Sequence, residues 1–102
     1  MDKYFEMNIK LAQVMTILLT KGIESNLDEA TQKDQDGVVS IDKDLQLQMS
    51  AEGGYMILHH IDKETGEIET INEGTEDADE IIDDIVGRII IGRVLESKKG
   101  AK

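Results

Sequence analysis

Apolar residues recur every three or four positions near the start of the chain, which predicts an amphipathic helix over residues 3–21. The stripe consists of Tyr4, Met7, Leu11, Val14, Met15 and Leu18. Four further apolar residues make it wider than one buried face requires: Phe5, Ile9, Ala12 and Leu19. Gly22 is a plausible helix stop. Residues 23–37 are mostly polar, so we expect a connection there, with one short helical turn near residues 27–30.

The pattern then changes to alternation over residues 38–49, which predicts β-structure with a bend or bulge at Lys43, where two shorter strands meet. One face is apolar: Val39, Ile41, Leu45, Leu47 and Met49. The other face is polar: Ser40, Asp42, Asp44, Gln46 and Gln48. A Gly-Gly pair at 53–54 marks a turn, and residues 55–61 predict a second strand. Because both of its faces are partly apolar, it is typical of a central strand.

The segment Asp62-Lys-Glu-Thr-Gly66 is typical of a hairpin, with a type I turn closed by glycine in the left-handed conformation. Residues 67–72 would return as a third strand. A final helix is predicted after Thr75, whose hydroxyl can cap it, with acids in the first turn and bases near the end. The apolar residues of this helix are Ile81, Ile82, Ile85, Val86, Ile89, Ile90, Val94 and Leu95.

The predicted order is helix, three strands, helix, which corresponds to a small α+β fold (αβββα) with a three-stranded antiparallel meander. Both helices would pack on one face of the sheet or be used in a dimer. The length suits one domain, so we interpret residues 1–102 as a single α+β domain. Residues 1–2 and 98–102 are expected to fray.

The composition narrows the classes of protein to consider. The chain has 102 residues, with 22 Asp and Glu against 11 Lys and Arg, so its formal charge is −11. It has no Cys, which excludes a disulfide framework, a thiolate metal site and a cysteine nucleophile. The acidic surplus disfavours direct binding to nucleic acid and to anionic membranes, since both need clustered Lys and Arg.

Neither export nor membrane insertion is indicated by the sequence. The first residues lack the basic region of a signal peptide. The longest apolar runs are far shorter than the ~20 residues that a membrane-spanning helix needs. We therefore expect a cytoplasmic protein without a membrane partner.

Seven carboxylates lie within twelve residues, and they are the candidate partner-binding residues: Glu73, Glu76, Asp77, Asp79, Glu80, Asp83 and Asp84. On a helix, steps of three and four residues would align five of them along one side: Glu76, Asp79, Glu80, Asp83 and Asp84. A field of this strength can steer a basic partner and speed its association. The alternative is a solvated face whose first turn complements the helix dipole.

In size, charge and the carboxylate row from Glu73 to Asp84, the chain resembles small phage-encoded inhibitors of host defence, such as anti-CRISPR and anti-restriction proteins. The resemblance implies a non-enzymatic inhibitor or modulator that acts as a nucleic-acid mimic. Its carboxylates would then accept charge-assisted hydrogen bonds from Arg or Lys in the basic site of a nucleic-acid-binding protein. We expect a basic protein partner and no direct contact with nucleic acid.

The last helix is richer in isoleucine than a helix covering one sheet face requires. Gly87 and Gly92 interrupt it, each at a cost of about 1 kcal/mol relative to alanine. Glycine at such positions lets another backbone approach closely. We therefore predict a homodimer whose oligomer interface consists of Ile82, Ile85, Ile89 and Ile90. The alternative function that follows is a structural or assembly protein that oligomerises through this helix.

The segment from Asp34 onward resembles the middle of an EF-hand calcium loop, with alternating acids followed by Gly37. Both ends depart from that pattern, because Gln32 and Lys43 occupy positions where the loop needs ligands. An Asp-Gly turn that feeds a strand is the preferred interpretation. Calcium binding at Asp34 and Asp36 remains a weaker alternative.

His59 and His60 are neighbours on a predicted strand, so their side chains point to opposite faces and do not share a metal ion. The sequence has no G-x-S-x-G nucleophile elbow and no glycine-rich loop that leads into a helix to hold a phosphate. We therefore expect a protein that is not an enzyme, with no catalytic residue, no bound metal and no cofactor.

Overall fold

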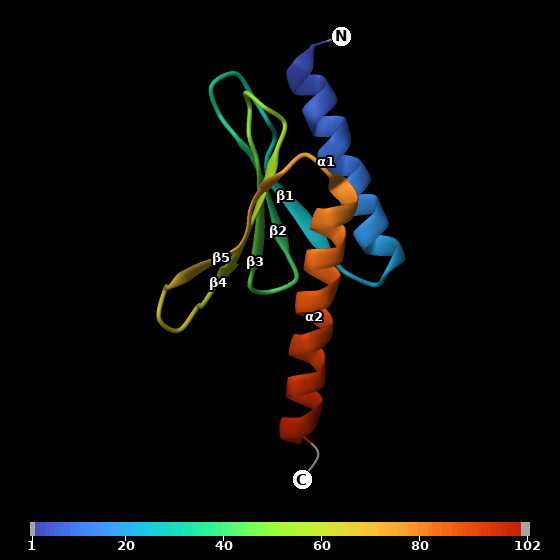
Figure 1. Ribbon diagram of the computed structural model, residues 1–102, viewed down its shortest axis with the longest axis vertical. Helices are drawn as coiled ribbons and strands as arrows, with labels where there is room; N and C mark the ends of the chain where they lie inside the picture. Colours follow the sequence, from blue (N-terminus) through green and yellow to red (C-terminus); the bar gives the residue numbers. More distant parts are fainter. Residues whose placement is uncertain (1, 101–102) are drawn as a thin grey trace.

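A computed structural model describes the backbone of residues 2–100 and the side chains of residues 2–97. Seven elements follow one another in it: α1 (Lys3–Thr20), β1 (Ser25–Glu29), β2 (Gly37–Ile41), β3 (Leu45–Met49), β4 (Met56–Ile61), β5 (Ile68–Thr75) and α2 (Ala78–Gly100). The strands form one antiparallel sheet in the order β1-β2-β3-β4-β5, and both helices lie on the same side of it (Figure 1). The α+β class is confirmed, but the meander has five strands instead of the predicted three.

The first helix matches its prediction closely. The Asp2 side chain caps it by accepting a hydrogen bond from the Tyr4 amide (2.8 Å). Gly22 follows the helix with a φ of 77°, and the Ile23 amide then donates to the Leu18 carbonyl (3.0 Å). The inner part of the predicted stripe is buried: Leu11, Val14 and Leu18. The residues that widened it are exposed: Phe5, Ile9, Ala12 and Leu19.

The core lies between one face of the sheet and the two helices. Its central row crosses three strands, because Val39 pairs with Leu47 and Leu47 pairs with Leu58, and all three side chains are fully buried. The five apolar residues predicted for one face of 38–49 are all in this core. The other face carries half-buried polar side chains such as Gln46 and Gln48, and no described helix lies over it.

The predicted connection over residues 23–37 is wrong in its middle, where the structure has β1 instead of a helical turn. Leu27 pairs with Val39 of β2, and Ser25 pairs with Ile41. Four of the five β1 residues are exposed, and β1 is an edge strand of the sheet. An edge strand has little buried surface to mark it in the sequence, so polarity alone made this segment look like a loop.

The chain between β1 and β2 folds beneath α1. The Asn8 side chain donates to the Thr31 carbonyl (3.1 Å) and accepts from the Thr31 amide (2.7 Å), which ties this loop to the helix. Gly37 lies next to Thr31 and to Leu11 of α1. A β-carbon there would collide with the Thr31 hydroxyl and lie 2.8 Å from the Leu11 Cδ1 atom, so the close approach of the loop requires glycine.

The predicted irregularity at Lys43 is a complete reversal of the chain. Residues 42–44 form the turn of a hairpin between β2 and β3, and Asp42 adopts a φ of 54° in it. The register pairs Ile41 with Leu45, which leaves the apolar residues of both strands on the same face. A single alternating pattern therefore continues through the turn, and for this reason the sequence reads as one interrupted strand.

The hairpin predicted at residues 62–66 is confirmed, and it joins β4 to β5. Asp62 accepts hydrogen bonds from the Glu64 amide (2.9 Å) and the Thr65 amide (3.2 Å), and Gly66 closes the turn with a φ of 76°. Strand β5 continues to Thr75, three residues further than predicted. The cap of α2 moves accordingly. Thr75 accepts from the Asp77 amide (3.1 Å), and the Asp77 side chain itself caps the helix by accepting from the Asp79 amide (2.9 Å).

The terminal segments expected to fray lie partly outside the described residues. Met1 and residues 101–102 are not described, nor are the side chains of residues 98–100. The backbone of α2 continues to Gly100, and the later turns of this helix extend beyond the β2–β3 and β4–β5 turns (Figure 1). Within the part of the chain that the structure describes, no strand lies beneath this projecting part.

Replacement of Leu47 by alanine should lower the free energy of unfolding by about 2–5 kcal/mol, because the truncated side chain leaves a cavity in the centre of the buried row. The matched control is Ile68→Ala. Ile68 is 65% exposed on the edge strand β5, so its truncation should change stability by less than about 0.5 kcal/mol. Urea unfolding followed by circular dichroism measures both. Equal losses in the two variants would contradict this core.

Candidate functional site

The first turns of α2 point their carboxylates away from the core. Ile81, Ile82 and Ile85 are buried against the sheet. Since each helical residue is rotated by 100° from the previous one, the acids between and beside these isoleucines lie on the outer surface. We call the following four residues the acidic face: Asp79, Glu80, Asp83 and Asp84. The first three are exposed and Asp84 is half-buried.

The other three predicted partner-binding residues flank this face without belonging to the helix. Glu73 is exposed on β5, Glu76 lies in the connection before α2, and Asp77 is the capping residue. The predicted row of five aligned carboxylates is therefore corrected to four, because α2 starts at Ala78 and Glu76 precedes it. The seven acids still gather around one end of one helix.

Asn72 of β5 connects the acidic face to the sheet. Its Nδ2 atom donates to the Asp84 carboxylate (2.8 Å) and to the Glu80 carboxylate (3.2 Å), and its Oδ1 atom accepts from the Gly74 amide (2.9 Å). One neutral amide thus holds two like charges side by side. The sequence carries no signal for this role, because a lone Asn in a strand belongs to no pattern. The β4–β5 hairpin and the helix α2 bring it to the carboxylates.

No ion pair between described residues neutralises the carboxylates of the acidic face. Within the part of the chain that the structure describes, the ion pairs join Glu69 to Arg88 (3.2 Å) and Asp44 to His60 (4.0 Å), and none of the seven acids takes part. Lys10 approaches Glu76, but its Nζ atom donates to the backbone carbonyl (2.5 Å). The helix dipole favours acids in the first turn of α2. The carboxylates are therefore stabilised locally while their field remains directed at solvent.

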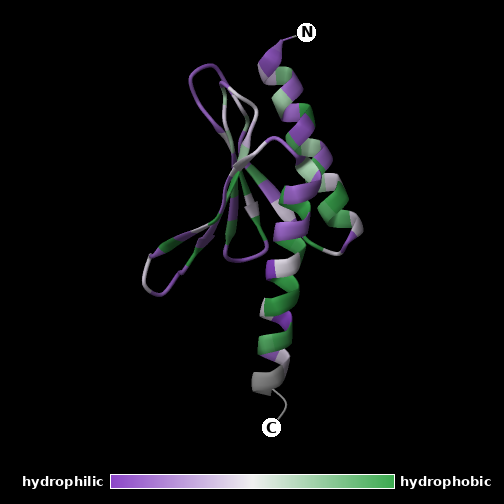
Figure 2. Ribbon diagram, in the orientation of Figure 1, coloured by the Kyte–Doolittle hydropathy of each residue, from purple (hydrophilic) through white to green (hydrophobic). Residues whose placement is uncertain are grey.

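Three of the four residues predicted for an oligomer interface face the core of their own chain. Ile82, Ile85 and Ile89 are 4%, 0% and 5% exposed, so they are unavailable to a second molecule. Ile90 is exposed. The apolar surface of α2 lies instead near its projecting end, where hydrophobic positions predominate (Figure 2). It consists of Ile90 (54% exposed), Ile91 (56%), Val94 (49%) and Leu95 (56%).

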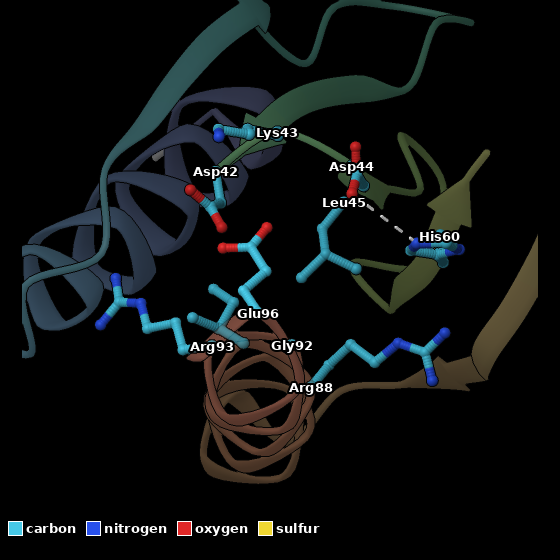
Figure 3. A pocket seen from close by; sticks show the side chains of 10 residues that line it. Asp42, Lys43, Asp44, Leu45, His60, Arg88, Gly92, Arg93 and Glu96 are labelled. Atoms are coloured by element: carbon cyan, nitrogen blue, oxygen red, sulfur yellow. Dashed lines mark ion pairs between the residues drawn. The ribbon is translucent and has the colours of Figure 1, made fainter. Parts of the chain in front are cut away.

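An open hollow of about 280 Å³ lies between the β2–β3 turn, β4 and the later part of α2 (Figure 3). The side chains of Asp42 and Glu96 extend into the same part of it, whereas Arg88 and Arg93 point outward on opposite sides. Arg88 reaches the carboxylate of Glu69 on β5 (3.2 Å). The hollow therefore has mixed charge and no convergent set of donors that would define one ligand.

The two histidines lie on opposite faces of β4, as predicted. His59 pairs with Gln46 on the uncovered face, and its Nδ1 atom lies 3.3 Å from the Thr70 hydroxyl. His60 faces the hollow, 4.0 Å from the Asp44 carboxylate. Among the described residues, no group of three or more His, Asp and Glu side chains is placed to hold a metal ion.

The segment around Asp34, which resembles part of a calcium loop in sequence, folds as a tight turn. Asp34 has a φ of 62° in a tight turn, where Gln32 and Gln35 form a bridge. Asp36 uses both carboxylate oxygens within the chain, since one accepts from the Gln48 amide group (2.6 Å) and the other from the Ala51 amide (3.0 Å). Asp36 therefore ties the loop to β3 and to the turn that follows it.

Comparisons with protein-family models, with curated proteins and with solved structures found no match for this chain. No helix in the described residues combines the length and the apolar character needed to cross a membrane.

Replacement of Asn72 by aspartate should lower the free energy of unfolding by about 1–2 kcal/mol, because a donor is lost and a third carboxylate joins Glu80 and Asp84. The loss should shrink at high salt, where repulsion between carboxylates near the surface is screened. Asn26→Asp, which adds the same charge to the exposed edge strand β1, is the control. Urea unfolding at low and at high salt tests this, and equal losses in the two variants would count against the contact.

Proposed function

We propose that this protein is a non-enzymatic binding protein that inhibits or modulates a basic, nucleic-acid-binding partner protein. The acidic face is the contact surface, and its carboxylates take the place of backbone phosphates. The observation that carries the proposal is the gathering of seven acids around one end of α2 with no described ion pair among them.

The position of the acidic face supports this role. A carboxylate that pairs with a cation of its own chain is less available to a partner. Among the described residues, the side chains of Asp79 and Asp83 take part in no hydrogen bond or ion pair. They stand four residues apart on a rigid helix, so their spacing is set before binding. A preorganised surface loses little conformational entropy on association. Arg and Lys of a partner would bind such carboxylates through charge-assisted hydrogen bonds.

The net charge of −11 supports the choice of partner. A strongly acidic protein attracts a basic surface over several ångströms and approaches it faster than a neutral protein would. It repels nucleic acid itself and other acidic proteins. A groove that normally holds DNA or RNA is the kind of basic site that such a surface fits best.

The test compares two variants that each remove three charges. Glu76→Gln, Asp79→Asn and Asp83→Asn together reduce the charge at the acidic face and next to it, while leaving the Asn72 contacts intact. The control removes exposed acids elsewhere through Glu29→Gln, Glu64→Gln and Glu67→Gln. Each protein is immobilised, and binding proteins are captured from a cell lysate at low salt, at high salt, and at low salt with excess duplex DNA.

We expect the unmodified protein and the control to capture a nucleic-acid-binding protein at low salt and to release it at high salt or with DNA. The acidic-face variant should bind that partner roughly tenfold more weakly, since each exposed ion pair contributes up to about 1 kcal/mol. Capture that is unchanged in this variant, or that resists both salt and DNA, would refute the proposal.

The second candidate function is that of a structural or assembly protein that oligomerises through the last helix. It is favoured by a separate observation, the exposed apolar residues on the projecting part of α2. The buried positions of Ile82, Ile85 and Ile89 mean that any such contact uses another side of the helix.

A further inference from the structure

The outer side of α1 exposes residues that the core of this chain does not use. Each residue turns the helix by 100°, so the side opposite the buried Leu11, Val14 and Leu18 faces away from the sheet. Five residues follow one another there at alternating steps of four and three, and all are exposed: Phe5, Ile9, Ala12, Thr16 and Leu19. Alternating steps of this kind form the seam along which two helices pack, so we call these five residues the α1 seam. The helix lies along one edge of the molecule, where a second element can reach it (Figure 1).

The α1 seam lies in a part of the chain that is nearly free of charge. Charged residues make up 32% of the sequence, but residues 7–20 contain one, Lys10, whose Nζ atom donates to the Glu76 carbonyl. Thr16 turns its hydroxyl back into the helix by donating to the Ala12 carbonyl (2.8 Å), so its methyl group remains for an apolar contact. The seam is therefore apolar along its length, and adjacent exposed apolar residues mark an interaction site.

A shallow hollow of about 430 Å³ lies in the middle of the α1 seam. It is lined by Ile9, Ala12, Gln13, Thr16 and Ile17. The first four of these residues stand at positions i, i+3, i+4 and i+7 of the helix, which is the arrangement of a hole that receives one side chain of a facing helix. Ala12 is the smallest of them and leaves the space that its larger neighbours surround. The shape therefore indicates that the occupant is a helix with an exposed aliphatic side chain.

We propose that two copies of this chain associate through an antiparallel pairing of their α1 helices, in which Ile9 of each copy enters the hollow of the other. The chain supplies the side chain that the hollow needs, because Ile9 is exposed on the same seam. In this register Phe5 lies against the partner's Thr16. The contact is self-complementary, as a two-fold symmetric dimer requires.

The distribution of charge favours a second copy as the occupant. Residues 2–21 contain three lysines and two acids and so carry a net charge of +1, whereas the whole chain carries −11. The helix α1 is therefore the element at which another copy meets little repulsion. At each end of the antiparallel pair, Asp2 lies at the level of the partner's Lys21. Asp2 uses its Oδ1 atom to cap its own helix, which leaves Oδ2 for the lysine, and the Lys21 side chain takes part in no ion pair between described residues.

The hollow also determines the direction of the pairing. In a parallel pair, Ala12 would face the partner's Ala12, so two small side chains would meet and both hollows would stay empty. Such a pair would also set Lys21 beside the partner's Lys21 and Asp2 beside the partner's Asp2. The antiparallel pair fills both hollows with Ile9 and brings opposite charges together.

The size of the contact predicts its strength. The helix α1 has 18 residues and is about 27 Å long. One helix pair of this length covers less than the roughly 800 Å² per partner that is usual for a stable complex. We therefore expect a weak dimer, with a dissociation constant on the order of tens of micromolar. The acidic face lies on α2, so the dimer does not rest on the function proposed for that face.

Sedimentation equilibrium over a range of concentrations tests the dimer. Ile9→Asp places a carboxylate in each apolar hollow and should weaken self-association at least roughly tenfold. Ile90→Asp makes the same change at a more exposed site on α2 and should leave self-association unchanged. A native protein that is monomeric up to millimolar concentration, or a dimer that survives Ile9→Asp, would overturn the proposal. A dimer that Ile90→Asp dissociates would place the contact on α2 and would overturn it as well.

Cysteine cross-linking tests the direction of the pairing, because the chain has no cysteine of its own. A mixture of the Phe5→Cys and Thr16→Cys variants should form a mixed disulfide under a mild oxidant, since the two positions face each other in the antiparallel pair. Each variant alone should not cross-link, because its two cysteines would lie about 17 Å apart along the helix, too far for a disulfide. In a parallel pair, each variant would cross-link with itself instead. That result, or the absence of a mixed product at concentrations where the unmodified chain dimerises, would exclude the antiparallel register.

Discussion

Burial of one apolar sheet face determines where the rest of this molecule lies. Val39, Leu47 and Leu58 form a continuous row across β2, β3 and β4, and antiparallel pairing places their side chains on the same face. A face of this kind has to be covered, because exposed apolar surface costs about 25 cal/mol per Å². The helix α1 and the first half of α2 cover it from the same side (Figure 1). The outward direction of the acids on α2 follows from that contact, because Ile81, Ile82 and Ile85 face the sheet.

The helix α2 is divided into regions by the same constraint. Where the sheet lies beneath it, its isoleucines face inward, so its acids can only face outward. Beyond the sheet, the helix no longer covers an apolar surface of the chain, and its apolar residues are about half exposed to solvent. The sequence pattern along the helix hardly changes, but its partner within the chain ends. One helix therefore presents a charged surface and an apolar surface in succession.

These two surfaces suit different kinds of partner. The acidic face offers charge with a fixed spacing, which favours a basic protein and fast, salt-sensitive association. The exposed apolar residues nearer the end of α2, which include Ile91 and Val94, offer a contact that depends little on charge.

Both helices, the α+β class, the β4–β5 hairpin with Gly66 at its turn and the alternation that fills the core could all be predicted from the sequence. These features are local: capping, helical periodicity and turn chemistry depend on residues near one another along the chain. It did not reveal β1, because an edge strand such as Ser25–Glu29 is stabilised by pairing with β2 and buries little of its own. It also assigned Ile82, Ile85 and Ile89 to a dimer, since periodicity shows that a helix has an apolar side but not what covers it. The tertiary structure answers that question, because it places the sheet against the first part of α2 and buries these isoleucines there. Which surface a helix face meets depends on residues that are distant in the chain.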